Sequence, residues 1–177
     1  MSYYFARCST VMHEQKYVEF LLEHYQDLNL PYSFPISLSF IASPLLMEDE
    51  KGECFLCFSD QHEVIGALGY IYGTGENQYQ DTHLIQIQIV YFREEYRKTT
   101  LFLHTLQFLI QYIAQLDREV KEFRFWTPAN DDLQRLFTKI ADKINSLETA
   151  FGPLDEYHAS FSHWYAYANK FRQETYF

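Results

Sequence analysis

The sequence predicts a single α/β domain that spans residues 1–177, and three observations support this fold class. Strand-like and helix-like hydrophobic patterns alternate along the chain. A length of 177 residues, 47% of them hydrophobic, is sufficient to enclose one buried core. No linker, internal repeat or second core divides the sequence, so we expect one domain.

The first third of the chain predicts a strand, a helix and an irregular segment. Residues 3–8 are strand-like, and the apolar positions after them recur at helical spacing behind Ser9 or Thr10, either of which can cap a helix. This helix should end before Pro31, because the residue that precedes a proline avoids helical backbone angles. Residues 29–50, which contain three prolines, are predicted to be irregular.

The middle of the chain predicts a hairpin and a third long strand. Residues 53–58 and 63–72 form the hairpin, with its turn at 59–62. Gly66 and Gly69 inside the returning strand indicate a bulge or the close approach of another group. Residues 83–92 alternate between two faces. We expect one face to carry Ile85, Ile87, Ile89 and Tyr91, and the other Gln86, Gln88, Val90 and Phe92.

The remaining elements follow from the same two periodicities. A deeply buried helix is predicted from about residue 102 to 116, a short strand at 122–126, a turn at 127–130 and a helix at 131–143. Residues 147–151 and 157–168 are predicted to pair as terminal strands across Gly152-Pro153. The last segment is ambiguous, since its apolar residues also fit helical spacing.

Composition restricts the possible partners. The net charge of −10 argues against nucleic acid as a partner, because phosphate binding requires concentrated Lys and Arg. The start of the chain does not resemble a signal peptide, and the longest apolar stretch is too short to cross a bilayer, so we expect a cytoplasmic protein that is not bound to a membrane. Cys54 and Cys57 lie three apart in a strand and face opposite sides, so they cannot share a metal. We expect no metal site, and cysteines that belong to the core.

The most informative segment is a strand, a short basic turn and a long helix. Residues 85–92 form the strand, residues 93–100 the turn, and the helix follows from residue 101 onward. The unpaired N–H groups of a helix N-terminus can hold an anion such as a pyrophosphate.

This order of elements, taken over nearly the whole chain, resembles the fold of the GCN5-related N-acetyltransferases (GNAT). Three local patterns support the resemblance: residues 63–70 with their Val-Ile-Gly, residues 92–97 with their Tyr-Arg turn, and Asn130 followed by Leu133, Leu136 and Phe137. The resemblance implies a mixed, mostly antiparallel twisted sheet flanked by helices on both faces. It also implies acetyl-CoA as cosubstrate and a small-molecule or peptide amine as acceptor.

The resemblance assigns a set of CoA-binding residues. Backbone groups of the strand end would pair with the pantetheine, the turn and the helix start would hold the pyrophosphate, and an asparagine on the next helix would bond the cofactor. The residues are Val90, Tyr91, Phe92, Arg97, Lys98, Thr99, Thr100, Leu101 and Asn130.

The sequence departs from the family pattern in the loop and in the catalytic groups. Thr100 and Phe102 stand where the family has small residues, and an inward rotamer of Phe102 would leave the pyrophosphate pocket open. Phe137 stands where many members carry a general-acid tyrosine, and it has no proton to donate. Gln86 and Gln88 replace the carboxylate of a general base, which leaves His83, His104 and Tyr96 as conceivable substitutes and the catalytic residues unknown.

Two functions therefore remain open. One is an acyl-CoA-dependent N-acetyltransferase with an atypical pyrophosphate loop, whose acceptor would bind near residues 29–50 and the aromatic side chains of that segment. The alternative is a non-catalytic binding or interaction module that has kept the fold. Either reading allows a homodimer through the aromatic terminal strands.

Overall fold

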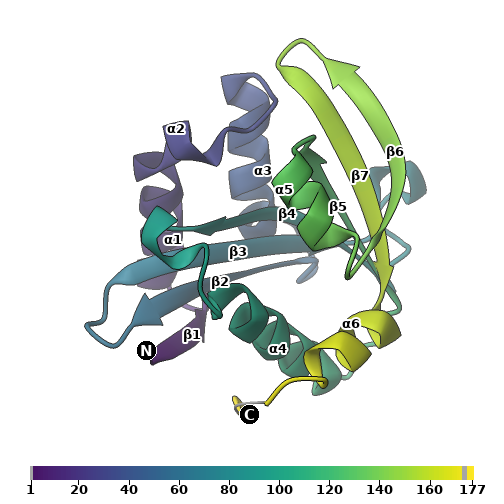
Figure 1. Cartoon of the computed structure of the whole chain (residues 1–177). Coiled ribbons are helices and arrows are strands. Elements are labelled where there is room, and N and C mark those ends of the chain that lie inside the picture. Colours follow the sequence, from purple (N-terminus) through teal and green to yellow (C-terminus); the bar gives the residue numbers. More distant parts are fainter. Residues whose placement is uncertain (1, 173–174) are drawn as a thin grey trace.

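The computed structural model describes residues 2–172 and 175–177, and this part of the chain forms one sheet with helices on both faces (Figure 1). The seven described strands are ordered β1-β2-β3-β4-β5-β7-β6, and all neighbours are antiparallel except β4 and β5. The strands are β1 (Tyr3–Arg7), β2 (Gly52–Ser59), β3 (Val64–Tyr72), β4 (Leu84–Phe92), β5 (Glu122–Pro128), β6 (Asp142–Thr149) and β7 (Gly152–Ser160). The predicted fold class, a mixed and mostly antiparallel sheet between helices, is confirmed.

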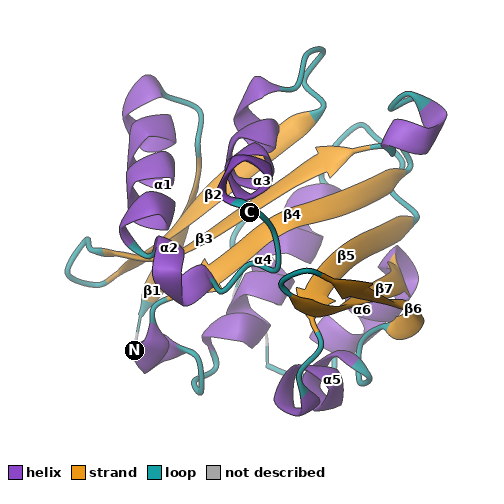
Figure 2. Cartoon of the chain, turned by 90° about the horizontal axis from the view of Figure 1, so that it is seen from above, coloured by secondary structure: helices purple, strands orange, loops and turns teal. Residues whose placement is uncertain are grey.

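The helices divide between the two faces of the sheet (Figure 2). One core cluster joins α1 and α3 to β2, β3 and the end of β4, and a second joins α4 and α6 to the opposite face. The helices are α1 (Val11–Glu23), α2 (Tyr25–Leu28), α3 (Phe34–Leu46), α4 (Leu101–Ala114), α5 (Asp131–Phe137) and α6 (Phe161–Ala168). As its all-round apolar sequence predicts, α4 is buried along most of its length.

Helix α3 corrects the prediction that residues 29–50 are irregular. Pro35 lies in the first turn of the helix, where a backbone N–H would have no intrahelical partner and proline is therefore tolerated. Pro44 lies close to the C-terminal end, so it interrupts only the last turn. The three prolines therefore do not exclude a helix here, because Pro35 occupies a position that a helix accepts and Pro44 interrupts only its last turn.

Gly69 lets α3 and α1 approach the sheet, as the sequence predicted for a glycine inside a strand. A Cβ atom at this position would come within 2.8 Å of Cγ of Pro44 on α3, and closer still to the hydroxyl of Tyr17 on α1. Such distances are too short for non-bonded carbon atoms. The glycine is therefore required by packing between the sheet and two helices.

A bulge in β4 corrects the predicted division of that strand into two faces. Consecutive residues Gly69 and Tyr70 of β3 pair with Ile89 and Ile87, so Gln88 is an extra residue in β4. Side chains beyond a one-residue insertion move to the opposite face. Ile85 and Ile87 accordingly pack on the α4 side, whereas Ile89 and Tyr91 pack on the α1 side.

The C-terminal region differs from the predicted elements in three respects. β5 continues through Thr127 and Pro128, which were predicted to lie in a turn. α5 ends at Phe137 rather than at residue 143, because Ile140 is drawn into the core, where its carbonyl accepts a 2.8 Å hydrogen bond from Nε1 of Trp164. The chain then enters β6, and the ambiguous last segment becomes the end of β7 followed by α6.

Two of the cysteines lie in the core. Cys54 and Cys57 are buried free thiols on opposite faces of β2, as predicted, and burial raises the pKa of Cys57 to about 12. Among the described residues, no three His, Cys, Asp or Glu side chains are grouped so as to hold a metal ion. No helix in the described ranges combines the length and hydrophobicity needed to span a bilayer.

Candidate functional site

The two parallel strands at the centre of the sheet separate along their length. β4 and β5 pair from Leu84 with Glu122 as far as Ile87 with Phe125, and no pairing between them continues beyond this point. The rest of β4 stays bound to β3, and the rest of β5 stays bound to β7. A gap therefore opens between the carboxyl ends of the two strands, where ligands commonly bind in α/β sheets.

Backbone groups on the β4 side of this gap are free to bind a ligand. The N–H of Arg93 donates to the carbonyl of Ile65 in β3 at 2.9 Å. Along a strand, the backbone N–H and C=O groups of successive residues point to alternate sides, so this bond fixes the direction of the preceding ones. The backbone groups of Tyr91 therefore face β3, whereas those of Val90 and Phe92 face the gap. Val90 is 42% exposed, so solvent reaches this part of β4.

The turn between β4 and α4 presents several unpaired N–H groups. The backbone N–H groups of Lys98, Thr100, Phe102 and Leu103 have no hydrogen-bond partner among the described residues. The Thr99 hydroxyl is already used, since it donates to the carbonyl of Tyr96 at 2.6 Å and accepts from the N–H of Leu101 at 3.2 Å. The helix start can therefore hold an anion through its backbone, without help from Thr99 or Leu101.

Arg97 points toward α2 instead of toward these N–H groups. Its Nη2 pairs with Oδ2 of Asp27, and its guanidinium lies 5.1 Å from the ring centroid of Tyr91. Its Nε donates to the carbonyl of Phe92 at 2.9 Å. Of the two carbonyls that face the gap, those of Val90 and Phe92, one is therefore already occupied.

Asp27 is the centre of this contact between α2 and β4, which we call the Asp27–Arg97 clasp. The Tyr91 hydroxyl donates to Oδ2 of Asp27 at 2.6 Å, and Arg97 donates to the same oxygen. The hydrogen bond from Tyr91, followed by that from Arg97, lowers the pKa of Asp27 below its usual value. Burial, together with the bond to Asp27, raises the pKa of Tyr91 to about 12. The clasp therefore holds an ionised carboxylate and a neutral phenol at neutral pH.

Lys98 carries the positive charge of the turn that is available to a phosphate, because Arg93 and Arg97 are paired with carboxylates. Arg93 forms ion pairs with Glu95 at 2.6 Å and with Glu63 at 3.5 Å. Lys98 is exposed and has no ion pair among the described residues. Lys98 and the N–H groups of the turn therefore provide the attraction for an anion at this site.

Two bulky side chains at the helix start turn inward. Phe102 is partly buried and packs against the α4 core cluster, so it takes the inward orientation that leaves the turn uncovered. Leu101 is fully buried beside Tyr3 and Ile65. The bulk of Phe102 is thus accommodated in the core.

Asn130 lies at the β5 side of the gap, where it caps α5. Its Oδ1 accepts hydrogen bonds from the N–H groups of Asp132 at 2.8 Å and Leu133 at 3.2 Å. This is the usual role of asparagine at a helix N-cap, and it leaves the side-chain NH₂ available to a ligand. The nine sequence-predicted residues thus form two groups, eight on β4, the turn and α4, and one on α5.

The conceivable catalytic substitutes lie away from the gap. His83 precedes β4 at its opposite end, and the rings of His104 and Tyr96 pack against Tyr3 of β1. Phe137 is packed at 5.0 Å from Phe125 and lies in the aromatic core. None of these positions brings a proton donor or acceptor to the gap.

Sequence reasoning missed two groups of polar residues, one at the open end of β4 and one on β5 and β7, where Glu122 pairs with Leu84 at the other end of β4. One is Asp27, whose role depends on partners 64 and 70 residues away in sequence. The other is a cluster on the face of β5 and β7 opposite the α4 core: His158 lies with Nδ1 3.2 Å from Glu122 and Nε2 2.7 Å from Glu156. Arg124 also reaches Glu122, at 3.1 Å. Alternate polar residues in β5 and β7 were the available signal for this cluster.

The sheet of this chain is mixed, its two parallel strands diverge, and unpaired N–H groups follow β4 at the start of α4. No protein-family model and no curated protein matches the sequence itself. Solved structures do match the fold. A mutant form of the spermidine/spermine N-acetyltransferase SpeG from Vibrio cholerae superposes with a TM-score of 0.65 at 10% identity, covering 94% of this chain and 98% of that one.

A second solved structure gives the same result. An acetyltransferase of the GNAT family from Staphylococcus aureus has a TM-score of 0.65 at 11% identity, with 90% of this chain and 99% of that chain covered. The predicted resemblance is therefore confirmed for the fold: this chain has the GNAT fold over most of its length.

Proposed function

We propose that this protein binds acetyl-CoA in the gap between β4 and β5 and transfers its acetyl group to an amine. The proposal rests on the end of β4–β5 pairing after Ile87 and Phe125, together with the unpaired N–H groups in the turn that follows β4. Such a gap can take an extended pantetheine along Val90, while the helix start takes the pyrophosphate. The same fold in named N-acetyltransferases supports this assignment.

The CoA-binding set follows the sequence prediction with altered roles. Val90 and Phe92 would contribute backbone groups, Lys98 its charge, and Thr100 its N–H. Arg97 would position the end of β4 through the clasp instead of binding phosphate directly. Asn130 would offer its amide from the opposite side of the gap.

The acceptor would approach from the face that carries Glu122, Glu156 and His158. Two carboxylates there can attract an ammonium group, and both nitrogens of His158 lie next to carboxylate oxygens. The SpeG neighbour is named for spermidine and spermine, which is consistent with an amine.

Calorimetric titration of acetyl-CoA into the protein tests the cofactor assignment. We expect a dissociation constant of about 10 μM or below for wild type. Val90→Pro should weaken binding at least about tenfold, because it removes an N–H that faces the gap and spares the bonds to β3. Val90→Ala keeps this N–H and is the matched control. Absence of binding by a folded wild type at millimolar ligand would reject the proposal.

The Asp27–Arg97 clasp and Phe137 favour a second candidate, a non-catalytic binding module. Arg97 is already neutralised by Asp27, and Phe137 cannot protonate a leaving thiolate. The two candidates differ in turnover: an enzyme releases free CoA from acetyl-CoA in the presence of amines, which a thiol reagent detects. A module that binds acetyl-CoA without such release would be the alternative.

The homodimer stays a prediction. β6 is one of the two edge strands of the described sheet, and on or just after it Ile144, Leu147 and Phe151 are 54%, 46% and 61% exposed. An exposed apolar edge strand is a typical surface for pairing with a second chain. A monomeric mass in light scattering at micromolar concentration would exclude this assembly.

A further inference from the structure

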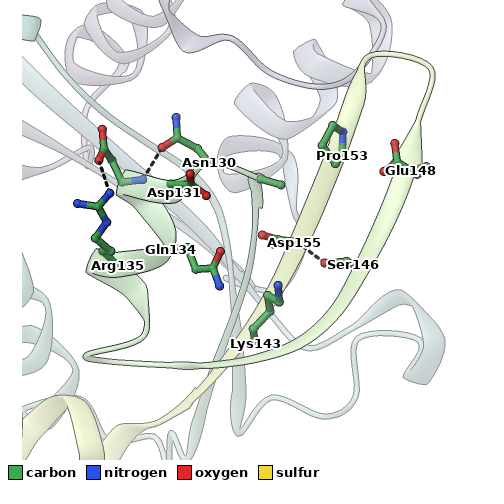
Figure 3. Close-up of a pocket in the computed structure, with 11 residues that line it drawn as sticks. Asn130, Asp131, Gln134, Arg135, Lys143, Ser146, Glu148, Pro153 and Asp155 are labelled. Carbon is green, nitrogen blue, oxygen red and sulfur yellow. Dashed lines mark hydrogen bonds and ion pairs between the residues drawn. The ribbon is translucent and has the colours of Figure 1, made fainter.

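A cavity lies between α5 and the β6–β7 hairpin and borders the proposed cofactor site only through Asn130 (Figure 3). Its volume is about 660 Å³, within the range of cavities that hold small organic ligands. Its lining residues come from the connection between β5 and α5, from α5 and from the hairpin, and none comes from β4 or α4. The cavity therefore needs an explanation of its own.

Asp155 is the buried group in this cavity. Its side chain belongs to a residue that is only 3% exposed, and Oδ1 accepts a hydrogen bond from the hydroxyl of Ser146. Oδ2 has no hydrogen-bond partner among the described residues, although Asp155 lines the cavity. Oδ2 is not completely enclosed, so a hydrogen-bond donor can reach it. The cavity is the side from which such a donor can arrive.

Lys143 offers the opposite charge to the same space. Figure 3 shows its side chain rising from β6 toward the region between α5 and Asp155. Its ammonium has no ion pair within 4.0 Å in the described part of the chain, whereas Arg135 is 4.0 Å from Asp132. Lys143 is exposed and lies beyond ion-pair distance of Asp155.

The remaining charged residues of the lining make the cavity more acidic than basic. Asp131 and Glu148 are exposed at its edge and have no ion pair among the described residues. They favour a ligand that carries a positive charge, and Lys143 adds a requirement for a negative one. Lys143 would repel a ligand with only positive charges, and Asp155 would repel a ligand with only negative charges.

We propose that this cavity binds a small zwitterion of the amino-acid type. Its ammonium group would donate to Oδ2 of Asp155, and its carboxylate would pair with Lys143. Gln134 of α5, which also lines the cavity, can bond to either end through its amide. The proposal is independent of acyl transfer, since it uses none of the residues assigned to the cofactor gap.

Titration calorimetry with three series of probes tests the charge pattern. The ω-amino acids from glycine to 6-aminohexanoate are compared with diamines and dicarboxylates of matched length. We expect one ω-amino acid to bind at least about tenfold more tightly than the diamine and the dicarboxylate of similar length. Equal or tighter binding of the diamine would overturn the proposal, as would a lack of saturable binding by all probes, which would leave a cavity filled by water only.

Charge reversal at Lys143 sharpens the test without disturbing the buried group. Lys143→Glu should weaken the preferred ω-amino acid at least about tenfold and make the matched diamine the tightest probe. Lys139→Glu is the matched control, because Lys139 is exposed but does not line the cavity. Asp155→Asn should remove binding of the ammonium group where the variant folds. Unchanged affinity for the ω-amino acid in Lys143→Glu would reject the assignment.

Discussion

The two halves of β4 show how one strand serves both the core and the candidate site. At its start, Leu84 and Ile85 are 1% and 0% exposed and the strand is paired on both sides. At its end, Val90 is 42% exposed and the strand is paired on one side only. The inserted Gln88 lies between these halves and moves the apolar side chains from one face to the other. A single extra residue thus separates the part of the strand that stabilises the sheet from the part that can bind a ligand.

Truncation of a side chain in each half of β4 should give the largest difference. Ile85→Ala removes a fully buried side chain from the α4 core and should lower the free energy of unfolding by about 2–5 kcal/mol. Val90→Ala should change it by about 0.5 kcal/mol or less, because the side chain is partly in water. Urea denaturation of both variants measures the difference. Equal losses would show that the open half of β4 is as firmly packed as the closed half.

The order of elements could be predicted because it depends on local periodicity. The strand at 83–92 and the buried helix after it follow from alternation and from apolar residues all around the helix. Asn130 was placed at the start of a helix, and the structure gives it a capping role that the residue type favours. These features require no knowledge of distant residues.

The missed features depend on residues that are far apart in the sequence. The Gln88 bulge is defined by pairing with β3, and the gap is defined by β5 turning toward β7. The clasp joins Asp27 to Arg97, and no pattern near Arg97 indicates that its charge is already used. α5 is shortened by Trp164, which lies 24 residues beyond Ile140. Local propensity cannot decide such outcomes, because tertiary contacts override it.

Gly69 provides an intermediate test of the closed part of the sheet. Gly69→Ala should lower the free energy of unfolding by about 1–3 kcal/mol, because the added Cβ would meet Pro44 and Tyr17. The matched control is Gly75→Ala, since a Cβ there would come no closer than 3.4 Å to a neighbouring atom. Thermal and urea denaturation compare the two variants. A loss at Gly75 as large as that at Gly69 would contradict the role assigned to close packing.

The smallest expected effect concerns the Asp27–Arg97 clasp at the open end of β4. Asp27→Asn should lower the free energy of unfolding at pH 7 by only about 0.5–1 kcal/mol, because the side chains of Asp27 and Arg97 are 46% and 38% exposed and solvent screens their attraction. The folded-state pKa of Asp27 is lowered by Tyr91 and Arg97, so its contribution is present above the unfolded pKa of about 4 and is lost as the pH falls through the folded pKa. The difference between wild type and Asp27→Asn should therefore shrink on acidification from pH 7 to below about pH 4.

Tyr91→Phe tests whether the phenol is the main cause of that lowered pKa. Loss of its hydrogen bond should raise the pKa of Asp27 toward the usual value while Arg97 remains in place. NMR titration of the Asp27 carboxyl carbon in both proteins measures this shift. An unchanged Asp27 pKa in Tyr91→Phe would mean that Arg97 alone determines the charge of the clasp. In that case the open end of β4 would be held to α2 by one ion pair, and its position would depend strongly on salt concentration.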